Sequence, residues 1–138
     1  MSNAHWLILA VPKWYFTSLT EPFAGRLLTV VPAIGSLCLL VGLMIGAIRP
    51  NWRLTIFVLP FMLTEALAAV AGFYRGEDGA FANYASNATL LVSAVVSIFG
   101  IYICKNARIA ASLLCVFSVT YCLFGVFVAD MSFSNDWL

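Results

Sequence analysis

Apolar positions gather in four long runs along the chain, and short polar segments separate the runs. The runs cover Leu27–Ile48, Leu54–Tyr74, Ala88–Cys104 and Ile109–Ala129. The hydrocarbon core of a bilayer, about 30 Å thick, is crossed by about 20 helical residues, and backbone polar groups in lipid must be paired within a helix or a closed barrel. The pattern therefore predicts an all-α integral membrane protein whose four runs form a four-helix transmembrane bundle.

A shorter apolar segment precedes the first run. Aromatic side chains flank Lys13 between Trp6 and Phe16, and Pro12 interrupts the segment. Aromatic residues are enriched where a bilayer meets water, so we expect an interfacial segment at about residues 5–25, lying against the membrane. Too little chain remains outside the runs to bury a second core, and we expect residues 1–138 to form one membrane domain.

The composition agrees with a membrane environment. Of the 138 residues, 63% are hydrophobic and 9% are charged, whereas a soluble domain is about half apolar and about a quarter charged. The net charge is +1, with no basic cluster along the sequence, so the chain lacks the positive surface that binds nucleic acid. We therefore expect the protein to lie in a lipid bilayer and not to bind nucleic acid.

Charge in the short loops predicts the orientation. The loops Arg49–Arg53 and Lys105–Arg108 each carry two cations and no acid, and both fall on the same side of the predicted bundle. The other side receives Lys13, Arg26 and Arg75 together with most of the acids. Because short cytoplasmic loops are enriched in Lys and Arg, we expect both termini outside, in a plasma membrane such as a bacterial inner membrane.

Two details of the helices follow from individual residues. The dense apolar part of the third run begins at Ala88, so Ser86 or Asn87 is the expected N-cap. Pro60 removes a backbone hydrogen bond inside the second run and predicts a kink there.

Glu65 is the outstanding single residue because it falls close to the middle of the second run. An ionised acid at the centre of a membrane helix costs about 2.5–3.5 kcal/mol on insertion scales. The ten Leu, Ile, Phe and Val residues of the same run return about 3–6 kcal/mol. Insertion is therefore feasible, and we expect Glu65 to face protein or water.

Glu65 has two interpretations. As a functional residue it is a proton or cation carrier that alternates between the two sides. As a structural residue it is a protonated acid that donates a hydrogen bond to Ser93, Ser97, Ser118 or a backbone carbonyl. None of the other three runs contains a Lys, Arg or His that would pair with it.

Small residues recur at spacings of three and four in every run, which puts each set on one helix face. Membrane helices associate through such small residues because their backbones approach closely. The predicted packing seam consists of Gly35, Gly42, Gly46, Ala68, Gly72, Ser93, Ser97, Gly100, Ala111, Cys115, Ser118, Cys122 and Gly125. The four cysteines, two of them in this seam, lie within the runs without a Cys-x-x-Cys spacing, and we interpret them as small packing residues.

The sequence lacks the residue sets that carry common membrane chemistry. Its one histidine is His5, so a bis-histidine haem within the bundle is excluded. Histidines and carboxylates do not cluster as a metal pair requires, and the loop acids Glu77 and Asp78 offer too few ligands for calcium. No serine or cysteine has a histidine to activate it. We therefore expect no metal, no cofactor and no enzymatic activity.

These observations leave more than one function open. The first hypothesis is a small accessory or interaction protein that packs with a larger membrane partner or with its own copies. The alternative is a small oligomeric transporter or channel that uses Glu65 as its proton- or cation-coupling acid. A thiol-active or lipid-modifying enzyme is a third alternative, because the chain contains four cysteines.

Overall fold

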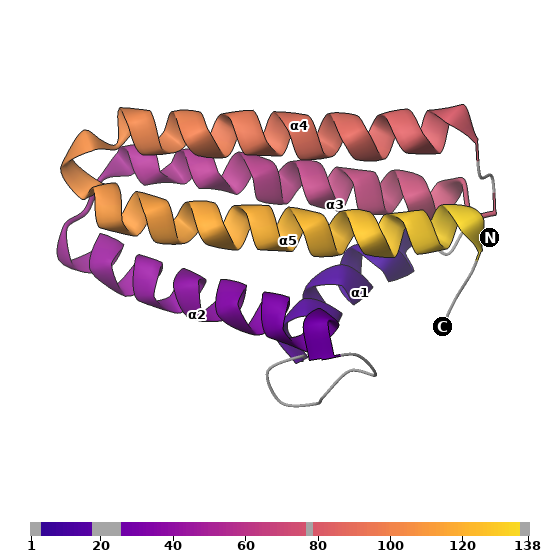
Figure 1. The fold of residues 1–138 in the computed structure, drawn as a ribbon, viewed down its shortest axis with the longest axis horizontal. Coiled ribbons are helices and arrows are strands. Elements are labelled where there is room, and N and C mark those ends of the chain that lie inside the picture. Colours follow the sequence, from indigo (N-terminus) through magenta and orange to yellow (C-terminus); the bar gives the residue numbers. More distant parts are fainter. Residues whose placement is uncertain (1–3, 18–25, 77–78, 136–138) are drawn as a thin grey trace.

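The computed structural model describes residues 4–17, 26–76 and 79–135, and most of them are helical (Figure 1). Five α-helices follow one another, with one 3-10 helix before the third and another before the fifth. Their bounds are α1 Ala4–Thr17, α2 Arg26–Ile48, η1 Trp52–Phe57, α3 Val58–Phe73, α4 Ala80–Ile103, η2 Lys105–Ala107 and α5 Arg108–Ser134. None of the described residues belongs to a strand. The prediction of an all-α fold is confirmed.

Four helical stretches are long and apolar enough to cross a membrane. They are Val30–Ile48, Trp52–Phe73, Ala80–Ile103 and Lys105–Ser134. Each corresponds to one predicted run, and the second stretch combines η1 with α3. The predicted number of long apolar helices is therefore confirmed.

Helix α5 occupies the centre of the bundle. It contacts α2, α3 and α4, and α1 reaches it as well. α3 and α5 run in one direction while α2 and α4 run in the other (Figure 1). Among the described residues, α2 and α4 make at most marginal contact with each other. Neighbouring helices approach α5 closely because small residues lie buried on several of its sides, including Ala110, Ala111, Ser118, Cys122 and Gly125.

The N-terminal segment lacks the interruption expected at Pro12, and its interfacial position stays a prediction. It forms the continuous helix α1, which runs through Pro12, and its buried face carries Leu7, Val11 and Tyr15. This face packs against α3, α2 and α5. Its residues recur every four positions, and their burial offsets the backbone hydrogen bond that a proline removes. The expected segment continued to residue 25, and residues 18–25 lie outside the described part of the chain.

Helix α4 begins earlier than the apolar pattern suggests. It starts at Ala80, eight positions before the expected Ala88, and Gly79 is its N-cap residue. The expectation that Ser86 or Asn87 caps this helix is wrong. Ser86 lies inside α4, is buried, and donates a hydrogen bond of 2.6 Å to the Asp130 carboxylate of α5. Contacts with α5 therefore extend the helix beyond its most apolar part.

Pro60 stands near the start of a helix and not in the middle of one. The 3-10 helix η1 ends at Phe57 and α3 begins at Val58, so Pro60 falls in the first turn of α3. Backbone N–H groups in a first turn have no intrahelical partner, and a proline there leaves no carbonyl unpaired. The expected kink is therefore a change of helix type next to Pro60.

Candidate functional site

Glu65 lies near the middle of α3, and its main polar contact joins α3 to α5. The hydroxyl of Tyr121 donates a hydrogen bond to Glu65 Oε1. Glu65 is half-buried as a residue, yet its Oε2 atom is buried and has no hydrogen-bond partner among the described residues. One carboxylate oxygen is thus fixed by a phenol while the other is enclosed without a donor.

The partners expected for Glu65 were wrong. The hydroxyls of Ser93, Ser97 and Ser118 are buried, and none has a hydrogen-bond partner among the described residues. Tyr121 takes their place because a phenol hydroxyl reaches farther from its backbone than a serine hydroxyl does. The signal available in the sequence was that Tyr121 is the one tyrosine of the fourth run, and a buried tyrosine hydroxyl usually finds a polar partner.

Aromatic rings surround the phenol of Tyr121. The Tyr121 ring lies 4.9 Å from the Tyr15 ring in an edge-to-face arrangement and 4.9 Å from the Phe61 ring. Phe117 lies 5.6 Å from Tyr121, and Phe124 lies 5.6 Å from Tyr15. We call these five residues the aromatic cluster. Edge-to-face pairs are worth about 0.5–1.5 kcal/mol beyond the area they bury, so the cluster holds the hydroxyl of Tyr121 in position.

A second phenol, that of Tyr15, ties α1 to α5. Its oxygen lies 2.8 Å from the Thr120 hydroxyl. Thr120 already donates its one hydroxyl hydrogen to the Val116 carbonyl, at 2.9 Å, so Tyr15 is the donor of the bond between them. A side chain at Gly35 of α2 would overlap both hydroxyls. The glycine therefore allows three helices to meet at one point.

Most of the predicted packing seam is buried. Ten of its thirteen residues are buried, whereas Gly46, Gly72 and Cys115 are half-buried. Besides Gly35, two more seam glycines make close contacts: a Cβ atom at Gly125 would overlap the Thr64 side chain, and one at Gly100 would lie 2.7 Å from Phe57. Tyr15 and Tyr121, which contact several helices in the middle of the bundle, do not belong to the predicted seam because that pattern consists of small residues only.

The chemistry of this site is that of a carboxyl group and two phenols. Together Glu65, Tyr121 and Tyr15 can hold a proton and orient hydrogen bonds. Within the described ranges, no three His, Cys, Asp or Glu side chains are arranged to hold a metal ion, and Cys38, Cys104, Cys115 and Cys122 are free thiols. The loop acids Glu77 and Asp78 lie outside the described residues.

The chain was compared with protein-family models, with curated proteins and with solved structures, and none of them matches.

Proposed function

We propose that this protein spans a lipid bilayer with four helices and acts as an accessory protein that packs with a larger membrane partner or with its own copies. The outward faces of its helices support the location in a bilayer. Large apolar side chains cover them, among them Leu37 of α2 at 62% exposure and Leu91 of α4 at 68%. Soluble monomers rarely expose contiguous apolar patches of more than a few hundred Å², and lipid tails would cover these side chains.

The observation that carries the accessory function is an uncovered stripe on the central helix. Its members Val116, Val119, Leu123 and Phe127 recur every three or four positions, and each is 37–49% exposed. We call these four residues the α5 stripe. It lies on the helix that both α2 and α4 contact, while those two helices make at most marginal contact with each other.

The α5 stripe suits a helix from another chain. Its side chains are less exposed than Leu37 and Leu91 on the flanking helices, so an added helix would gain contacts with α5 and with its neighbours. In a bilayer, helices associate mainly through dispersion contacts, which grow with the number of close atom pairs. A helix seated on the stripe gains more such contacts than one placed against the outer face of α2 alone.

Orientation and location are part of the same proposal. The loops that carry Arg49, Arg53, Lys105 and Arg108 lie at one end of the bundle, opposite the end of α5 (Figure 1). Positive short loops favour the cytoplasmic side. We therefore propose that this end faces the cytoplasm, that both termini lie outside, and that the membrane is a plasma membrane, such as a bacterial inner membrane.

Native mass spectrometry after gentle extraction from the host membrane tests this function. We expect a complex with a partner or a homo-oligomer, and we expect Leu123→Trp to lower the assembled fraction by obstructing the α5 stripe. Leu37→Trp, on the outer face of α2, is the matched control and should leave assembly unchanged. A wild-type protein recovered only as a monomer would contradict the accessory function.

A second candidate function rests on the buried oxygen of Glu65 that has no partner. In an oligomer, this carboxyl group would act as the proton- or cation-coupling acid of a transport pathway. Flux through proteoliposomes tests it: Glu65→Gln should abolish coupled flux, whereas Leu91→Ala on the outer face of α4 should leave flux intact. Equal flux in wild type and Glu65→Gln would exclude this mechanism.

A further inference from the structure

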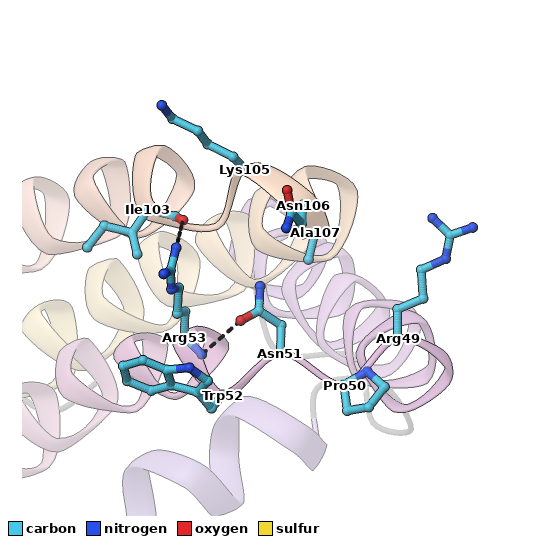
Figure 2. Close-up of a pocket in the computed structure, with 9 residues that line it drawn as sticks. All are labelled: Arg49, Pro50, Asn51, Trp52, Arg53, Ile103, Lys105, Asn106 and Ala107. Carbon is cyan, nitrogen blue, oxygen red and sulfur yellow. Dashed lines mark hydrogen bonds between the residues drawn. The ribbon is translucent and has the colours of Figure 1, made fainter.

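Cations from two separate loops line one hollow at the end of the bundle where α2 and α4 finish. The cavity has a volume of about 450 Å³, and its lining includes Arg49, Arg53, Lys105, Asn51 and Asn106 (Figure 2). No acidic side chain is among its lining residues. The hollow therefore has the charge that attracts an anion.

Two of these cations, Arg53 and Lys105, contact neighbouring groups and retain hydrogen-bonding capacity. Arg53 Nη1 donates a bond of 3.3 Å to the Ile103 carbonyl at the end of α4. A guanidinium carries five N–H donors, so further donors of Arg53 remain available for an anion. The ammonium of Lys105 lies 5.1 Å from the ring centroid of Tyr102, and Arg49 lies on the other side of Asn51 from Arg53 (Figure 2).

The start of α5 adds to the positive character of the hollow. Ala107, which lines the cavity, is the N-cap residue of α5, and no side chain caps the helix there. The first N–H groups of a helix lack intrahelical partners and carry the positive end of its dipole. They would supply backbone donors beside the three cations.

An apolar groove continues from the cationic hollow along the side of the bundle. It has a volume of about 740 Å³, its lining includes Ile56, Phe99 and Tyr102, and it shares Trp52, Arg53, Ile103 and Lys105 with the cavity. Trp52 and Tyr102 are both exposed, and such aromatic residues are typical of the boundary between lipid and water. A polar site and an apolar site are thus joined at Arg53 and Lys105.

We propose that the hollow and the groove together bind one anionic phospholipid, with the phosphate among Arg49, Arg53 and Lys105 and an acyl chain along Ile56 and Phe99. This inference rests on the proposed membrane location. Charge complementarity identifies the headgroup, and the continuous apolar groove identifies the chain that a free anion lacks. Cations that only set the orientation of the helices would need no shared cavity, because the positive-inside effect depends on their number in the loops.

Native mass spectrometry of the purified protein with added lipids tests the site. Wild type is titrated with dioleoyl phosphatidylglycerol and, separately, with dioleoyl phosphatidylcholine. We expect one phosphatidylglycerol per chain to be retained in preference. Each cation near an anionic lipid contributes about fivefold in affinity. The affinity of the double variant Arg53→Gln/Lys105→Gln for phosphatidylglycerol should therefore be about 30-fold lower than that of wild type. Arg75→Gln, near the opposite end of the bundle, is the matched control and should bind as wild type does.

Competition with inorganic phosphate separates the two sources of a phosphate group. We expect millimolar phosphate to leave the bound phosphatidylglycerol in place, and Phe99→Ser to weaken its retention. Displacement by phosphate, equal retention of both lipids, or unchanged binding in the double variant would each overturn the lipid site. The same spectra report the assembled fraction, so an oligomer without lipid preference contradicts only this inference, and a lipid-binding monomer contradicts only the accessory function.

Discussion

Tyr121 donates its hydroxyl hydrogen to Glu65 and so links the central helix α5 to α3 near the middle of both helices. The bond gives the acid a fixed neighbour in a part of the bundle where it is half-buried. It also gives Tyr121, which is fully buried, the polar partner that a buried phenol requires. Each residue thus lowers the free-energy cost of burying the other among apolar side chains.

Removal of the phenol hydroxyl should destabilise the bundle. In Tyr121→Phe, Glu65 Oε1 loses the donor that it has in wild type, while Oε2 has none to lose, and we expect unfolding in detergent to become easier by about 1–2 kcal/mol. Thermal unfolding followed by circular dichroism measures the change. Tyr84→Phe, at an exposed position of α4, is the matched control. Equal melting temperatures for both variants would mean that the bond contributes nothing.

Substitutions at Glu65 should separate the acceptor from the charge. Glu65→Gln keeps a carbonyl oxygen that accepts from Tyr121, so its melting temperature should stay close to that of wild type. Glu65→Ala removes the acceptor and should cost about 1–3 kcal/mol. The comparison uses the same detergent and pH for both variants. If Gln proves as damaging as Ala, the carboxyl group interacts with something other than the Tyr121 hydroxyl.

The approach of α3 to α5 at Gly125 should not tolerate a methyl group. A Cβ atom at Gly125 would overlap the Thr64 side chain, so we expect Gly125→Ala to cost about 1–3 kcal/mol. Gly79→Ala is the matched control, because nothing lies within 4 Å of a Cβ atom built there. Leu123→Ala in the α5 stripe is a second comparison: it removes an outward side chain, so it should lower the melting temperature less than Gly125→Ala does. A melting temperature equal to wild type in Gly125→Ala would show that these helices can separate freely.

Cys104 should resist alkylation although it lies beside an exposed lysine. Its side chain is fully buried, between α4 and η2. In a chain whose other three cysteines are replaced by alanine, a water-soluble maleimide should modify it slowly until a denaturing detergent or heat unfolds the protein. Adding Asn106→Cys provides an exposed thiol two positions away as the fast control. Rapid modification of Cys104 would place it on an accessible surface.

The long helices were predictable because lipid-spanning length and apolar composition are local properties of the sequence. Their ends were less predictable. Ala82 and Ser86 extend α4 by packing and hydrogen bonding to α5, and such contacts depend on a partner more than 40 positions away. The path of α1 was obscured for a similar reason. Pro12 marks an interruption locally, while the burial of Val11 and Tyr15 against other helices keeps the helix intact.

At the candidate site, too, the sequence predicts a local feature but not a contact between distant residues. Glu65 stood out in the sequence because one acid in an apolar run is conspicuous. Its partner could not be chosen from Ser93, Ser97, Ser118 and Tyr121, because the choice depends on how α3 packs against both α4 and α5. One contact that brings α3 close to α5 is that of Thr64 with Gly125, where a Cβ atom would overlap the Thr64 side chain.

The central place of α5 has a consequence for the order of biogenesis. Chains are made from the N-terminus, and α5 is the last of the described helices to leave the ribosome. Until then α2 has only α1 as a substantial neighbour, because its main contacts are with α5. Helices α1, α3 and α4 can pack against one another before α5 emerges, whereas α2 gains its main neighbour only with this final helix. At the proposed membrane location, α2 would therefore be the last of the helices to dock.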